Sequence, residues 1–163
     1  MGRVDVASVS QGELERLYRD EFARLVRVAS AITRDEAVGV EAVQEAFVRL
    51  LRARRRYRGE GAVEGWVWRT AVNEAKRFAT RERANREAIE PPGTNGTASE
   101  GGATRALIGV LPERQRLAIF LRYYADLDYR TIAAVLEVEV GTVSATLASA
   151  HRSLRSAMEG AVR

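Results

Sequence analysis

One segment without apolar periodicity divides this chain into two stretches in which apolar residues recur at helical spacing. The segment, PPGTNGTASEGG at residues 91–102, consists mainly of residue types that favour turns and flexible coil. On both sides of it, apolar residues recur every three or four positions, and no stretch alternates as a strand would. The sequence therefore predicts an all-α chain of two small helical domains, residues 10–87 and 105–160, joined by a flexible linker, residues 88–104.

Three helices are expected in the first domain: residues 11–33, a second from Asp35 to Leu51, and residues 63–86. Ser10 and Glu13 have the spacing of a capping box at the start of the first helix, and Asp35 is suited to cap the second. A basic, glycine-containing loop, RARRRYRGEGAVEG at residues 52–65, is expected to separate the second helix from the third.

Three further helices are expected in the second domain, over residues 111–125, 128–136 and 140–158. Their apolar stripes contain Leu117, Phe120, Leu121 and Tyr124, then Ile132, Ala133, Val135 and Leu136, then Val143, Leu147, Ala150, Leu154 and Met158. A tight turn and a small residue such as Ala133 are typical of a helix-turn-helix, whose second helix reads the major groove of DNA. On the pattern alone, a three-helix unit that does no more than pack is the alternative.

Positive charge is concentrated in the middle of the chain. The net charge is +4, but residues 49–86 hold twelve basic and four acidic side chains, and Lys76 is the only lysine among them. The planar guanidinium group binds phosphate bidentately, so clustered arginine indicates a nucleic-acid partner. The alternative is a solvated helix face.

Several classes of protein are excluded by what the chain lacks. It has no cysteine, and His151 is the only histidine, which removes disulfides, thiolate metal sites and most catalytic triads. No run of eighteen apolar residues is present, and the N-terminal residues lack the apolar stretch of a signal peptide. We therefore expect no enzyme, no catalytic residue, no small-molecule substrate, no cofactor, no metal and no membrane insertion.

Three stretches, in this order, resemble the extracytoplasmic-function sigma factors of bacterial RNA polymerase, in the sigma-70 family. VEAVQEAFVRLLR, residues 40–52, is similar to the family's polymerase-binding helix. YRGEGAVEGWVWRTAVNEAKR, residues 57–77, is similar to its segment that melts and reads the −10 element. LPERQRLAIFLRYYADLDYRTIAAVLEVEVGTVSATL, residues 111–147, is similar to its −35-reading segment. The two domains would then be sigma region 2 and sigma region 4.

The resemblance implies a set of contacts with core polymerase, through its β′ and β subunits. Carried over to this chain, the contact residues are Val43, Gln44, Phe47 and Leu51. Phe47 and Leu51 are equally well explained as core residues. Gln44 is harder to place in a core, because a buried amide needs hydrogen-bond partners.

A second set would bind the −10 element, where opened strands need positive charge and stacking surfaces. It comprises Arg54, Arg55, Arg56, Tyr57, Arg58, Trp68, Arg69, Asn73, Lys76 and Arg77. Trp66 aligns with a family tryptophan that is mostly structural, so we expect it in the core. Arg77 stands where the family usually has Asp, which adds positive charge at this point.

A third set would contact the −35 element: Thr142, Ser144, Thr146, Ser149, His151, Arg152 and Arg155. At 144, 146, 149 and 151 the family commonly has Lys, Arg, Arg and Arg, so bidentate readout of guanine is lost. Glu137 replaces the family's turn glycine, and Glu139 replaces the serine that would cap the recognition helix. Because fewer cations lower the affinity for DNA, this surface is expected to be weakened.

The leading hypothesis is a cytoplasmic sigma factor that binds core polymerase, directs it to promoter DNA and starts transcription. One alternative is a sigma-like regulator that binds polymerase or an anti-sigma-type partner with weak or no −35 reading. Another is a helix-turn-helix transcriptional regulator, which would not explain VEAVQEAF followed by an arginine loop. Many members of the family are held by an anti-sigma factor, and nothing in these residues decides whether this chain has one.

Overall fold

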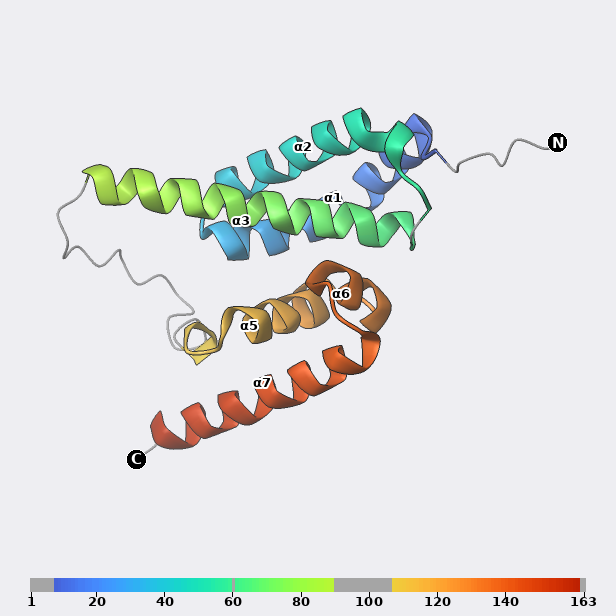
Figure 1. The fold of residues 1–163 in the computed structure, drawn as a ribbon. Coiled ribbons are helices and arrows are strands. Elements are labelled where there is room, and N and C mark those ends of the chain that lie inside the picture. The colour runs from blue at the N-terminus through green and yellow to red at the C-terminus, as the bar shows by residue number, and fades with distance from the viewer. Residues whose placement is uncertain (1–7, 60, 90–106, 162–163) are drawn as a thin grey trace. The chain divides into compact units, whose positions relative to one another are not determined.

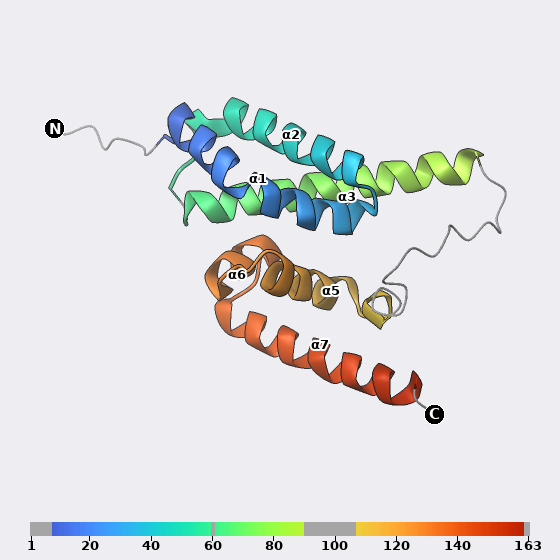
Figure 2. The same cartoon turned by 180° about the vertical axis from the view of Figure 1, so that it is seen from behind.

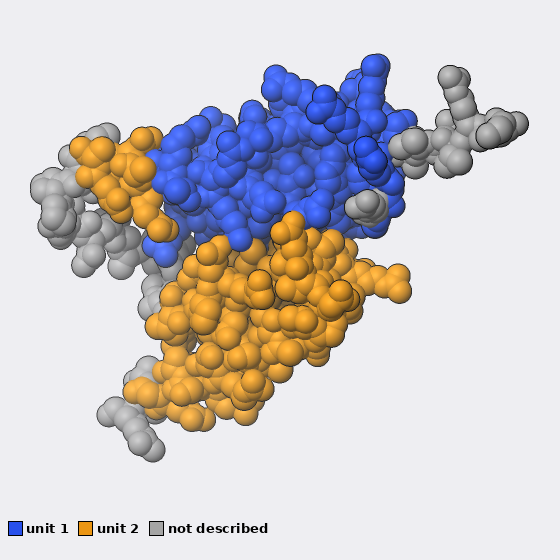
Figure 3. All heavy atoms as spheres, in the orientation of Figure 1, with its two compact units in different colours: residues 1–82 blue, residues 83–163 orange. Residues whose placement is uncertain are grey.

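The computed structural model describes residues 8–59, 61–89 and 107–161, and within these ranges the chain is helical and has no strand. The all-α prediction is confirmed. The chain forms two compact units, residues 1–82 and 83–163 (Figure 3). The linker predicted at 88–104 lies almost wholly outside the described residues, and the domain limits of 10–87 and 105–160 stay predictions.

The first unit begins with two capped helices at the predicted places. Helix α1 is Gln11–Thr33, and the Ser10 hydroxyl accepts a hydrogen bond from the Glu13 N–H at 3.1 Å. Helix α2 is Glu36–Ala53, and the Asp35 carboxylate accepts one from the Val38 N–H at 3.0 Å. Each cap satisfies an N–H group that has no partner within its helix.

A short 3₁₀ turn, η1 (Arg54–Arg56), follows α2 and leads to helix α3 (Val63–Ile89). Helices α1, α2 and α3 lie side by side in a bundle (Figures 1 and 2). The apolar stripe of α2 is fully buried at Val43, Ala46 and Leu50. On α3, Trp68 is fully buried, and the Arg24 guanidinium of α1 lies 5.8 Å from its ring centroid. These contacts bring all three helices into one core.

The second unit contains the predicted helix-turn-helix. Its elements are α5 (Glu113–Ile119), the π-helical segment η2 (Phe120–Tyr124), α6 (Tyr129–Leu136) and α7 (Val140–Ala161). The Asp128 carboxylate caps α6 by accepting from the Thr131 N–H at 2.7 Å. Helices α6 and α7 meet at 90°, which is the crossing expected between the two helices of this motif.

The π-helical segment corrects one predicted stripe. A π turn contains more residues than an α turn, so side chains after it rotate relative to the α-helical pattern. The Ala125 N–H accordingly bonds the Phe120 carbonyl, and Tyr124, expected in the core, is exposed. Ala125 and Leu127 are buried in its place. Met158, also expected on the core face, is exposed near the end of α7.

Among the described residues, no single helix is long and apolar enough to cross a membrane. The bent pair Tyr129–Leu136 and Val140–Gly160 meets that test when the two helices are taken together, by length and composition only.

Candidate nucleic-acid interface

The outer face of α2 presents only part of the predicted polymerase contact. Gln44 is exposed and Leu51 is half-buried. Val43 is fully buried, and Phe47 is buried with its ring edge-on to Tyr18, the centroids 4.8 Å apart. The prediction was therefore wrong for Val43 and Phe47 as surface contacts, because both belong to the core between α1 and α2.

The arginine segment lies at the junction of α2 and α3. Arg55, Arg56 and Arg58 are exposed. Arg54 is half-buried, and its Nη1 donates to the Leu51 carbonyl at 2.9 Å. That bond satisfies a carbonyl at the negative end of α2, where cations are favoured. Arg54 thus has a structural contact, while the other three arginines present their charge to solvent.

An aromatic pair stands beside these arginines. The rings of Tyr57 and Trp66 lie 4.9 Å apart at 33°. The Tyr57 hydroxyl donates to the Gly61 carbonyl at 2.6 Å, across a loop in which Gly59 and Gly61 have φ of 72° and 92°. Burial raises the pKa of this hydroxyl, so it stays protonated and keeps its role as a donor. The pair therefore has a fixed orientation.

The burial of the two tryptophans is the reverse of the prediction. Trp66, expected in the core, is half-buried and packs on Tyr57, whereas Trp68, expected as a stacking surface for bases, is 0% exposed. Residues two apart on a helix point in nearly opposite directions, so only one of the two can face the core. Trp68 was wrongly assigned to the DNA-binding set, and Trp66 is the ring with an exposed surface.

Helix α3 continues the cationic surface. Asn73 and Arg77 are exposed and stand four residues apart, so they share one face of the helix, while Arg69 and Lys76 are half-buried. The part of α3 that follows Trp66 therefore combines an amide with several cations.

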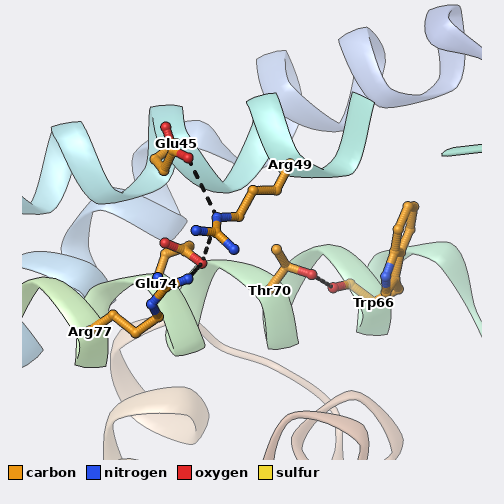
Figure 4. A network of polar contacts seen from close by, with 6 residues as sticks. All are labelled: Glu45, Arg49, Trp66, Thr70, Glu74 and Arg77. Atoms are coloured by element: carbon orange, nitrogen blue, oxygen red, sulfur yellow. Dashed lines mark hydrogen bonds and ion pairs between the residues drawn. The ribbon is translucent and has the colours of Figure 1, made fainter. Parts of the chain in front are cut away.

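A buried carboxylate that the sequence reasoning missed lies next to Asn73. Glu74, with a side chain only 6% exposed, pairs through Oε1 with Arg49 Nε at 2.9 Å and with Arg77 Nη1 at 3.2 Å. Arg49 also reaches Glu45 at 3.4 Å, so the network joins α2 to α3 (Figure 4). Arg77 and Glu74 are three residues apart on α3, a spacing that the sequence shows, whereas the pairing of Glu74 with Arg49 depends on how α2 packs on α3.

On helix α7, only some of the side chains predicted to contact the −35 element are exposed. Thr142 and Ser144 are exposed, as expected of a reading surface. The Thr146 hydroxyl donates to the Thr142 carbonyl at 2.8 Å, within its own helix. Ser149 accepts from Gln115 Nε2 of α5 at 3.1 Å, so it faces the helix-turn-helix core. Ser149 is half-buried, and its role as a DNA contact stays a prediction.

Farther along α7, the charged residues are exposed. Arg152 and Arg155 are open to solvent, and His151 Nε2 lies 3.0 Å from the Tyr123 hydroxyl. At the entry of the helix, Glu139 is exposed, and Glu137 holds a left-handed conformation with φ 55°. Negative charge at Glu139 therefore precedes a neutral first half of α7, and positive charge begins at Arg152, more than three helical turns later.

Within the described ranges, no group of three or more histidine, cysteine, aspartate and glutamate side chains is placed to hold a metal ion. What the two units offer is a cationic junction with an aromatic pair and a helix-turn-helix. This combination is typical of a DNA-binding protein of the helix-turn-helix class.

Comparison with known proteins identifies the family. Residues 17–85 match the family described as sigma-70 region 2, and residues 102–154 match sigma-70, region 4. The chain is 30% identical to the ECF RNA polymerase sigma-E factor of Escherichia coli K12 over 164 residues, covering 84% of this chain and 83% of that protein. It is 29% identical to the RNA polymerase sigma-H factor of Pseudomonas aeruginosa, covering 76% and 74%. This chain belongs to the extracytoplasmic-function (ECF) sigma factors of the sigma-70 family.

Two solved structures share the fold. CnrH in complex with the cytosolic domain of CnrY gives a TM-score of 0.71 at 20% identity, covering 95% of this chain and 93% of that one. The sigma factor RpoE of Bartonella quintana, in complex with the anti-sigma factor NepR, gives 0.64 at 15% identity, covering 90% and 97%. At these identities the likeness concerns the fold alone.

Proposed function

We propose that this ECF sigma factor binds bacterial core RNA polymerase through the outer face of α2 and opens promoters with the arginine segment that follows it. The observation that carries this proposal is the exposure of Arg55, Arg56 and Arg58 directly after the helix that carries Gln44. The polymerase performs the catalysis, and the sigma factor supplies binding and positioning. Its place of action is accordingly the cytoplasm.

At the −10 element, the exposed arginines would bind phosphates while the Trp66–Tyr57 pair offers a surface for an unstacked base. Asn73, exposed on α3, has an amide that can donate to and accept from a base edge. Each of these groups belongs to the first unit, so opening does not require the second unit to read sequence.

At the −35 element, we propose that α7 positions the polymerase through phosphates more than it reads bases. Ser144 and Thr142 are the exposed polar residues of its first half, and Arg152 and Arg155 follow. Hydroxyl groups bond phosphates and bases without the bidentate geometry that selects guanine. The neutral first half also supports a second candidate: a sigma-like regulator that binds polymerase without selecting a −35 sequence.

The test is transcription in vitro by bacterial core polymerase over a pool of genomic promoter fragments. The chain is expected to yield specific run-off transcripts and to bind core polymerase in a pull-down. Binding without a promoter-specific footprint would support the second candidate, and failure to bind core polymerase would refute both.

A charge-reversal variant tests the arginine segment itself. Arg55→Glu, Arg56→Glu and Arg58→Glu together are expected to abolish strand opening, measured by permanganate reactivity of unpaired thymines, while core binding persists. The matched control reverses Arg16, Arg19 and Arg27, three exposed arginines of α1, and changes the net charge equally. Strand opening that survives the first variant, or fails equally in the control, contradicts the proposal.

We further propose that the accessible surface of the first unit is open to an anti-sigma factor, since RpoE of Bartonella quintana, which has the same fold, forms a complex with the anti-sigma factor NepR. Copurification of a protein that blocks core binding from the native cell would support this part. Its absence would leave the polymerase and promoter functions unaffected.

A further inference from the structure

The charge network that joins α2 to α3 includes a buried carboxylate shared by two cations. Two guanidinium groups, from Arg49 and Arg77, share one oxygen of the buried Glu74 carboxylate. Both cations keep exposed surface, since their side chains are 43% and 61% exposed. The anion is buried and both cations are partly exposed, and Figure 4 shows the contacts that join them.

The burial of Glu74 makes its pairs persistent. Salt screens exposed pairs strongly and buried pairs much less. A carboxylate that has left water also needs its cations, because breaking such a pair leaves an uncompensated charge. Arg77, three residues later on the same helix, is therefore held at Glu74 by an attraction that salt weakens less than it weakens a fully exposed pair.

Arg77 is also one turn beyond Asn73 on the exposed face of α3. A free arginine at this place would reach any phosphate nearby, because its long side chain has many rotamers. With its Nη1 on Glu74, the remaining N–H groups of the guanidinium face only a limited region beside the helix. The ion pair with Glu74 therefore restricts the directions in which the Arg77 guanidinium can contact a phosphate.

We propose that Glu74 is a positioning residue for promoter binding: it holds the Arg77 guanidinium so that Arg77 serves a strand placed beside Asn73 and not any nearby phosphate. This rests on the proposed function only in taking that face of α3 to meet the opened strand. Glu74 thereby lowers the general affinity of the chain for single strands and raises its selectivity for a strand that lies beside Asn73. The Arg that replaces the usual Asp at 77 does not act as a free cation.

The experiment measures binding of the full chain to oligothymidylate, which carries no promoter sequence, by fluorescence anisotropy over a range of salt. Glu74→Gln keeps the side-chain shape and an oxygen acceptor but removes the charge that holds Arg77. We expect the slope of log K against log salt to steepen by about 0.7, the value for one added phosphate contact on a single strand. Between about 50 and 200 mM salt this is about a 2.6-fold larger loss of affinity.

Two variants separate the tether from the charge change alone. Glu45→Gln removes an equal charge and contacts the same Arg49, but no ion pair joins Glu45 to Arg77, so its slope should match the wild type. Glu74→Gln combined with Arg77→Gln should return to the wild-type slope. A rise in the Glu45 variant, or a rise that persists without Arg77, overturns the proposal, as does the lack of any rise in Glu74→Gln.

A further measurement does not depend on whether Glu74→Gln folds. In the native background, Arg77→Gln should flatten the slope by less than half as much as Arg55→Gln, because Glu74 already compensates the Arg77 charge. Equal effects would overturn the proposal, and so would a failure of every variant to bind oligothymidylate at low salt. Run-off transcription by the wild-type chain is scored separately, so the proposed function can fail or stand independently of this result.

Discussion

Replacing Gly39 by Ala should destabilise the first unit, although alanine is the better helix former. Helices α1 and α2 approach closely where Gly39 faces Ser30. A Cβ at position 39 would lie 2.5 Å from the Ser30 hydroxyl oxygen, 2.7 Å from its backbone nitrogen and 2.9 Å from its Cα. The hydroxyl could rotate away, but the two backbone atoms belong to α1 and move only with the helix.

The magnitude follows from two opposed effects. Alanine gains about 1 kcal/mol over glycine in a helix interior. Forcing an extra carbon into a packed contact costs about 1–3 kcal/mol, and an overlap with backbone lies at the upper end. The expected net loss is about 2 kcal/mol in the free energy of unfolding. For a domain of this size that lowers the melting temperature by about 8–16 °C.

Thermal unfolding followed by far-ultraviolet circular dichroism measures the change. Gly12→Ala in α1 is the matched control, because a Cβ there meets nothing within 4 Å, and it should leave stability unchanged or slightly raised. Adding Ser30→Ala to Gly39→Ala should not restore stability, since the overlap with backbone remains. If Gly39→Ala is as stable as Gly12→Ala, α1 and α2 do not pack as closely as the structure has them.

Three other predictions concern the second unit. Glu137→Gly should stabilise it by up to about 1 kcal/mol in chemical denaturation, because φ of 55° strains a residue with a side chain and glycine has no such penalty; a loss of stability would contradict this. Ser144→Lys should raise the affinity for duplex DNA and steepen the slope of log K against log salt by about 0.9. Thr146→Lys should have a smaller effect, because residue 146 is half-buried. Equal effects of the two variants would refute the placement of these side chains. Asp128→Ala should cost about 1 kcal/mol at neutral pH through the lost cap. The hydrogen bond from the backbone of Thr131 is the chief cause that lowers the pKa of Asp128 in the folded state below its ordinary value of 3.8. The stabilisation from the cap is therefore fully present above about pH 3.8 and is lost as the pH falls through the lower folded pKa. A stability difference between wild type and variant that persists at strongly acidic pH would contradict this.

Much of the fold could be read from local patterns. Ser10 and Asp35 each cap the helix that they were expected to cap, because an N-cap requires only a short polar side chain and the N–H groups two or three residues later. Apolar spacing gave α1 its bounds at residues 11–33. The order of the three family-like stretches also indicated the sigma factor, which the family matches confirm.

The candidate site was less predictable, since exposure of a side chain depends on contacts with distant parts of the chain. Trp66 and Trp68 have similar neighbours in the sequence, and only the rotation of α3 against α1 and α2 places Trp68 inside. Ser149 lies at a DNA-contact position in the family pattern, yet its hydroxyl oxygen accepts a hydrogen bond from Gln115 of α5. Patterns of neighbouring residues predict neither the burial of Trp68 nor the bond between Gln115 and Ser149, because the contacts come from other helices.

The sequence by itself therefore determined the helices, their caps, the division into two parts and the arginine-rich junction, because these depend on residues close together in the chain. Tertiary structure alone decided which tryptophan is exposed, that a π-helical segment after α5 turns Tyr124 outward, and that Glu74 is buried against Arg49 of α2. Such choices depend on how each helix is rotated against its neighbours, and that rotation is set by the packing of the whole core.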